Sequence, residues 1–189
     1  MVFTFDFICF WWPFNYQKSI YKVVEQNLIM RKIFKALLIY SFLFINISSA
    51  SANNWSFYTG MFDYSDEGKK ANLFGVQYIN TEDSYFGTLQ SVTGAMITAD
   101  NATYFYKGFQ IQNGDGAFKF TPSFTPGLYF EGDGKDLGHV IEFKTELQIS
   151  FEISSNSELG FSYNHISNAS LGDKNPGANS YMFNFIKKF

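Results

Sequence analysis

The most constraining feature of the sequence is a long run, residues 138–154, in which apolar and polar side chains alternate. Successive side chains of a β-strand point to opposite faces, so a strand here has one mostly apolar and one polar face. The mostly apolar face comprises His139, Ile141, Phe143, Thr145, Leu147, Ile149, Phe151 and Ile153. The opposite face comprises Val140, Glu142, Lys144, Glu146, Gln148, Ser150 and Glu152. Alternation over ten or more residues is typical of a strand that crosses a membrane.

The chain after Ala52 contains further runs with the same two-residue period. We predict eight strands, near residues 54–63, 70–80, 84–98, 102–113, 116–130, 138–154, 158–169 and 179–189. Turn-forming segments such as NGDG and LGDKNPGA separate them. No apolar run in this part of the chain is long enough to span a membrane as a helix.

These runs favour an eight-stranded antiparallel transmembrane β-barrel. Aromatic residues make up 21% of the chain, yet the mean hydropathy is near neutral, −0.10, as expected for alternating strands. The last run alternates Tyr181, Phe183 and Phe185 and ends on Phe189, which resembles the assembly signal of bacterial outer-membrane proteins. The alternative is a soluble β-sandwich or lipocalin-like barrel, which would bury the same apolar face.

An eight-stranded barrel encloses a lumen just wide enough for side chains. We therefore expect Glu142, Lys144 and Glu146 to form structural pairs inside the barrel. A porin function does not fit this geometry.

The N-terminal part of the chain predicts a targeting segment. Residues 30–52 combine a basic start, an apolar core and the site Ala50-Ser51-Ala52, the pattern of a secretory signal peptide. Residues 1–29 precede it, and we interpret them as a non-native extension from an over-extended gene start; the alternative is a membrane-associated aromatic extension. Residues 53–189 are then the barrel.

The charge and the cysteine content exclude several classes of function. The net charge is −3, and no basic run indicates nucleic acid. The single cysteine, Cys9, cannot form an intramolecular disulfide. Two histidines without nearby matching carboxylates do not predict a metal site, and we expect no cofactor.

Candidate chemistry lies in the seventh run. Leu159, Phe161, Tyr163, His165 and Ser167 share one face. Neighbours on one face lie roughly 6.5 to 7 Å apart at the backbone, within reach of flexible side chains. A general base and a hydroxyl nucleophile at the edge of an apolar wall indicate ester chemistry on a lipid.

The segment FSYNHISNASLGDKNPGANSY resembles the C-terminal signature of the lipid A 3-O-deacylase (PagL) family, in which H-x-S-N precedes a loop and an acid near the start of the last strand. TPSFTPGLYFEGDGKDLG and IEFKTELQISFEI also resemble that family. The resemblance implies a bacterial outer-membrane barrel that removes an ester-linked acyl chain from lipid A. It assigns Ser167 as nucleophile, His165 as general base and Asn179 to the position of the acid. It implies Asn168 and Asn175 as donors to the oxyanion.

The amide at the acid position is a departure from the family. Asn179 can accept the imidazole N–H but supplies no negative charge, so the enzyme is expected to be slow, to recruit Asp173, or to be inactive. The alternative function is a weak or inactive small outer-membrane barrel with a structural or adhesion role; another is a soluble lipid-binding barrel. The expected partners are the membrane and lipid A or lipopolysaccharide of the outer leaflet, with a homodimer left open. Strand parity, with both termini in the periplasm, places the His165 rim outside the cell.

Overall fold

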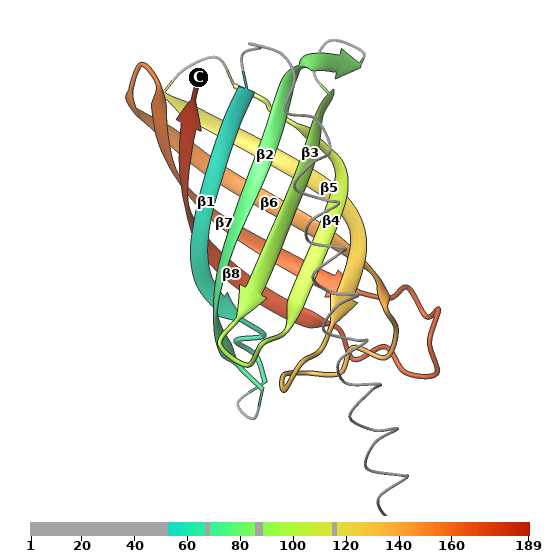
Figure 1. Cartoon of the computed structure of the whole chain (residues 1–189). Coiled ribbons are helices and arrows are strands. Elements are labelled where there is room, and N and C mark those ends of the chain that lie inside the picture. Colours follow the sequence, from blue (N-terminus) through green and yellow to red (C-terminus); the bar gives the residue numbers. More distant parts are fainter. Residues whose placement is uncertain (1–52, 67–68, 86–88, 115–116) are drawn as a thin grey trace, which may run out of the picture. The chain divides into compact units, whose positions relative to one another are not determined.

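The computed structural model describes residues 53–66, 69–85, 89–114 and 117–189. These residues form a closed barrel in which each strand pairs with the next along the chain (Figure 1). The strands are β1 (Asn53–Phe62), β2 (Ala71–Tyr85), β3 (Leu89–Thr98), β4 (Thr103–Ile111), β5 (Phe118–Phe130), β6 (Ile141–Ser154), β7 (Ser157–Ser167) and β8 (Ala178–Lys188). The predicted extension 1–29 and signal peptide 30–52 lie outside the described residues, so that division stays a prediction.

Every strand pairing is antiparallel, and β1 closes the barrel against β8. The predicted eight-stranded antiparallel barrel is therefore confirmed. The predicted strand ends were wrong by a few residues where the backbone turns. β6 begins at Ile141 rather than residue 138 because Gly138 adopts a positive φ of 94°. β7 ends at Ser167 because Ala169 and Ser170 enter the left-handed region.

The apolar face of the strands is directed away from the lumen. The exposed large apolar side chains include Phe57, Phe74, Ile97, Phe109, Phe120, Phe124, Leu147, Ile149, Phe151, Leu159, Phe161, Phe183 and Phe185. In β6, exposed Leu147 and Ile149 alternate with buried Glu146 and Gln148. This orientation is that of a membrane-spanning barrel, and a soluble sheet with buried phenylalanines is excluded. The described residues include no helix long and apolar enough to cross a membrane.

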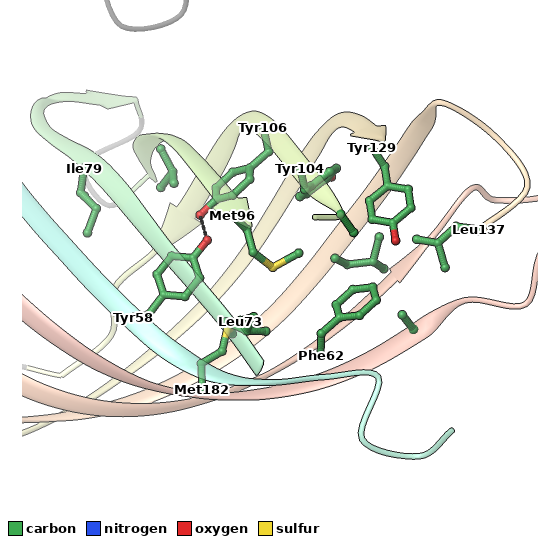
Figure 2. Close-up of a cluster of buried hydrophobic side chains, with 14 residues drawn as sticks. Tyr58, Phe62, Leu73, Ile79, Met96, Tyr104, Tyr106, Tyr129, Leu137 and Met182 are labelled. Carbon is green, nitrogen blue, oxygen red and sulfur yellow. Dashed lines mark hydrogen bonds between the residues drawn. The ribbon is translucent and has the colours of Figure 1, made fainter. Parts of the chain in front are cut away.

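The lumen is packed with side chains (Figure 2). Tyr58 and Tyr106 meet in its middle, their hydroxyl groups 2.9 Å apart. Glycine makes room for both rings: a Cβ at Gly75 would lie 2.1 Å from the Tyr58 ring, and one at Gly94 would lie 2.4 Å from the Tyr106 ring. The two rings therefore leave no room for a side chain at residues 75 and 94.

The buried charges of β6 are only partly paired as predicted. Lys144 Nζ lies 2.8 Å from Glu146 Oε2 and 4.1 Å from the centre of the Tyr106 ring. Glu142, by contrast, makes no ion pair with any described residue, although it also lies two residues from Lys144 on the same buried face. Lys144 and Glu146 thus form a structural pair, and Glu142 stays outside it.

The connections after β1, β3, β5 and β7 gather at the barrel end opposite the C-terminus (Figure 1). We call this the site end. The loop 131–140 contacts the connection 99–102 through Asp133 N–H, which donates to Asp100 O at 2.8 Å. The same loop buries Leu137 in the mouth of the lumen (Figure 2). The loops therefore cover the lumen and support one rim of the barrel.

Candidate active site

His165 and Asn179 face each other across the β7–β8 pair. They occupy directly opposite positions in the register, and His165 Nδ1 lies 2.8 Å from Asn179 Oδ1. Because an amide oxygen only accepts hydrogen bonds, Nδ1 carries the proton in this contact. Nε2 of the neutral ring then keeps its lone pair, as a general base requires. The parity prediction that Asn179 points to the same outer face as His165 agrees with this contact.

Further contacts hold both ends of the Asn179 amide. Tyr163 Oη donates to Asn179 Oδ1 at 3.0 Å, and Asn179 Nδ2 donates to Ser65 Oγ at 3.5 Å. Tyr163 stands two residues before His165 on β7, whereas Ser65 lies in the turn after β1. The amide oxygen therefore accepts from both Tyr163 and His165, on the outer face of the barrel.

The backbone of Asn179 is held by the turn after β1. Asp63 Oδ1 accepts its N–H at 3.3 Å, and Tyr64 N–H donates to its carbonyl at 3.0 Å. Asp63 is 1% exposed and pairs with Lys135 Nζ, which also approaches Asp66. Asp63 therefore links the β1–β8 seam, the loop 131–140 and the candidate site.

Gly177 packs against the edge of the His165 ring. A Cβ at Gly177 would lie 2.8 Å from His165 Cε1 and 3.3 Å from Nε2. The residue also has a φ of +62°, in the left-handed region that glycine adopts without strain. Gly177 thus combines two requirements: a tight turn into β8 and space for the imidazole.

Ser167 ends β7 on the same side of the strand as His165. It is half-buried and lies opposite Phe143 of β6 in the register. Within the described residues, no hydrogen bond joins its hydroxyl to His165. The two side chains share a face at a backbone separation of about 6.5–7 Å, and apo active sites often show such loose contacts.

Asn168 and Asn175 contact each other within the loop 168–177. Asn168 is completely buried, and its Nδ2 donates to the carbonyls of Leu137 and Lys174, both at 2.8 Å. Its backbone N–H donates to Asn175 Oδ1 at 3.0 Å. All the N–H groups of Asn168 are therefore engaged within the protein, and the exposed Asn175 keeps its amide N–H₂ outside these contacts.

The loops 131–140 and 168–177 are also joined at their surface. Lys174 Nζ lies 2.6 Å from Asp136 Oδ2, and Gly138 N–H donates to Asp136 Oδ1 at 2.7 Å. The hydrogen bond from Lys174 holds the pKa of Asp136 below its usual value, and the Gly138 N–H lowers it further. The charged form of Asp136 is thus favoured, although the exposed pair contributes little to stability.

The structure brings His165 and Asn179 into contact and places Ser167 on the same face of β7, whereas Asn168 is buried and contacts Asn175 instead. Asp173, considered above as a replacement acid, is exposed and forms no hydrogen bond or ion pair with the other described residues. Sequence reasoning missed Tyr163, Asp63 and Gly177. Only Tyr163 could have been found from the sequence, since the strand pattern places it on the face of His165, two residues away. In the described parts of the chain, no three His, Cys, Asp or Glu side chains gather where they could hold a metal.

A closed antiparallel barrel with an apolar outer face and a histidine–asparagine pair at one rim defines a transmembrane β-barrel with a candidate active site facing the lipid. Residues 41–187 match the family model described as Lipid A 3-O-deacylase (PagL). The chain belongs to the lipid A 3-O-deacylase (PagL) family. This membership and the barrel fold indicate an outer-membrane protein.

A solved structure of the family supports the fold. The crystal structure of the outer membrane enzyme PagL superposes with a TM-score of 0.54 at 16% identity, covering 71% of this chain and 98% of that one. A de novo designed transmembrane β-barrel gives a TM-score of 0.48 at 12% identity, covering 75% of this chain and 98% of that one. No curated protein matches the sequence.

Proposed function

We propose that this protein is an outer-membrane hydrolase that removes an ester-linked acyl chain from lipid A, with Ser167 as nucleophile and His165 as general base. Family membership supports the substrate class and the reaction. The observation that carries the mechanism is the 2.8 Å contact between His165 Nδ1 and Asn179 Oδ1, which leaves Nε2 free to take a proton. Ser167 lies two residues after His165 on the same face of β7.

The reaction proceeds in two halves. Ser167 Oγ attacks the ester carbonyl carbon while His165 Nε2 takes the hydroxyl proton. The tetrahedral intermediate then collapses, the C–O bond to the sugar breaks, and His165 returns the proton to the departing sugar oxygen. In the second half, water attacks the acyl-serine, with the same histidine accepting and returning a proton, and the free fatty acid leaves.

The negative oxygen of each tetrahedral intermediate needs hydrogen-bond donors about 3 Å away. We assign this role to Asn175 and to backbone N–H groups of the loop 168–177. Asn168 was expected to donate as well. Because its own N–H groups already bind Leu137, Lys174 and Asn175, it contributes by holding the loop and Asn175 in place.

The substrate reaches the site from the bilayer rather than from water. Below His165 on β7, the exposed side chains of Tyr163, Phe161 and Leu159 form an apolar wall. Phe183 of β8 extends this wall and packs edge-on against Phe161, with the ring centres 5.5 Å apart. An acyl chain lying along the wall would bring its ester to the rim, so the site needs no closed pocket. With the site end outside the cell, the ester would belong to lipid A of the outer leaflet.

A second candidate is a weakly active or inactive barrel with a structural or adhesion role. Two observations favour it: a neutral amide occupies the acid position, and the Ser167 hydroxyl does not contact His165. This alternative predicts that expression leaves lipid A unchanged.

The proposal is tested by the release of fatty acid from purified lipid A in mixed micelles. Ser167→Ala should abolish release above the uncatalysed background, because the variant lacks the proposed nucleophile. Ser91→Ala is the matched control: Ser91 is a half-buried serine of β3, away from the site end. It should retain full activity. Equal release by the Ser167→Ala variant and the native protein would exclude Ser167 as the nucleophile.

A further inference from the structure

We propose that Tyr163 is a positioning residue, which holds the Asn179 amide with its oxygen toward His165 and so sets the tautomer of the imidazole. The inference rests on the proposed function for its effect on turnover. The tautomer itself can be measured without turnover.

An amide at the acid position can face the histidine in two ways. With Oδ1 toward the ring, which is the orientation in the structure, Nδ1 must carry the proton and Nε2 is free. With the amide rotated by half a turn, Nδ2 would donate to Nδ1, and the ring proton would move to Nε2. A protonated Nε2 cannot take the proton of Ser167. In serine proteases, an Asp-to-Asn change that produces the wrong tautomer lowers kcat by about 10⁴.

The Tyr163 hydroxyl favours the productive orientation. It donates to Asn179 Oδ1 at 3.0 Å, the same oxygen that accepts from His165. In the rotated amide, Nδ2 would take this place, and the phenol oxygen would have to accept. A phenol donates better than it accepts, because the ring withdraws the oxygen lone pair. Ser65 Oγ, on the other side of the amide, accepts from Nδ2, but its hydroxyl could equally donate to the oxygen of a rotated amide, so the preference comes from Tyr163.

The surroundings of Tyr163 keep its hydroxyl in place. Its ring packs edge-on against Tyr64 with centres 6.3 Å apart, and it lies opposite Tyr181 in the β7–β8 register. The side chain faces the membrane, where water is scarce and a hydroxyl without a partner is costly. Its hydroxyl donates to Asn179 Oδ1 and also interacts with the Tyr64 side chain.

A carboxylate at residue 179 would not need Tyr163 to orient it. Both of its oxygens accept hydrogen bonds, so either orientation leaves the proton on Nδ1. The role of Tyr163 should therefore exist only while residue 179 is an amide. A purely structural role in the aromatic cluster would persist in both backgrounds.

The first test is ¹⁵N NMR of histidine-labelled protein in lipid nanodiscs. The chain has two histidines, and His139→Gln identifies the His165 signals. In the native protein and in the control Tyr181→Phe, the proton should reside on Nδ1. In Tyr163→Phe, a signal of the Nε2-protonated form should appear. An unchanged Nδ1-protonated ring in Tyr163→Phe would overturn the inference.

The second test is a double-mutant cycle on the release of fatty acid from lipid A. Tyr163→Phe should lower kcat by about tenfold, the effect of one net hydrogen bond, with KM unchanged. In an Asn179→Asp background, the same change should alter kcat by less than about twofold. An equal loss in both backgrounds would overturn the inference. If the native protein releases no fatty acid at all, the proposed function fails, and the NMR result alone decides the role of Tyr163.

Discussion

Asp63 and Asn179 contact each other although 116 residues separate them in the chain: Asp63 Oδ1 accepts the Asn179 backbone N–H at 3.3 Å. Asp63 directly follows β1, and Asn179 is the second residue of β8. The contact therefore fastens the seam where the barrel closes, next to the candidate site. The same buried carboxylate pairs with Lys135, so the charge of Asp63 holds the seam and a loop together.

Asp63→Asn should weaken this seam and lower activity. The substitution keeps the shape of the side chain and tolerates the positive φ of residue 63, but it removes the charge that binds Lys135. We expect the free energy of unfolding to fall by about 1–3 kcal/mol, the range for a buried charged hydrogen bond. Urea unfolding in vesicles measures it. Asp66→Asn is the control, since Asp66 is only partly buried and approaches the same lysine; equal losses in the two variants would contradict this role of Asp63.

Gly177→Ala should impair turnover more than stability. The new Cβ would meet the His165 ring at 2.8 Å and push it out of line with Ser167. We expect a loss of about tenfold or more in kcat, because small displacements of a catalytic group are costly. Gly132→Ala is the matched control: Gly132 also has a positive φ, 57°, but its Cβ would meet Asn101 instead. If both variants lose activity alike, backbone strain rather than the histidine contact explains the effect.

Asn168→Ala should loosen the loops of the site end. It leaves the buried carbonyl of Leu137 and the partly buried carbonyl of Lys174 without their donor, which costs about 1–3 kcal/mol. The exposed pair of Asp136 and Lys174 joins the same two loops, and Asp136→Asn should cost at most about 1 kcal/mol. Limited proteolysis of residues 168–177, together with urea unfolding, measures both. Faster cleavage in Asp136→Asn than in Asn168→Ala would reverse this ranking.

Asn179→Glu should raise the rate of acyl release. A carboxylate would stabilise the imidazolium that forms when His165 takes the proton, which a neutral amide cannot do. We expect kcat to increase by about tenfold or more. The upper bound is the factor of ~10⁴ by which an Asp-to-Asn change lowers turnover in serine proteases. Asn179→Ala, which removes the acceptor of the Nδ1 proton, should lower kcat instead. A Glu variant no faster than the native protein would show that the missing charge does not limit turnover.

Local alternation was sufficient to predict the barrel and part of the site. His165, Ser167 and Asn179 fall on the outer face because side-chain direction repeats every two residues along a strand. The ends of β6 and β7 could not be predicted, because the turns of the backbone at Gly138 and Ala169 depend on the conformation of the loops. The partners of Asn168 depend on how those loops fold over the lumen.

The residues that surround Asn179 show the same limit. Asp63 and Ser65 reach it only because β1 and β8 are neighbours in the closed barrel. Barrel closure could be predicted, but the register of that seam could not. Gly177 was interpreted as part of an Asn-Pro-Gly turn, and nothing local indicates that its missing side chain accommodates an imidazole. Long-range register and loop packing therefore determine the details of the site.

Mass spectrometry of lipid A, from cells that express the native chain, Ser167→Ala or no barrel, decides whether this protein is a deacylase. We expect native expression to lower the mass of lipid A by one ester-linked acyl chain. Ser167→Ala, present in the outer membrane at the same level, should leave the mass as in cells without the barrel. Unchanged lipid A in cells with well-folded native protein would rule out the proposed activity, and the same mass loss with Ser167→Ala would rule out the proposed nucleophile.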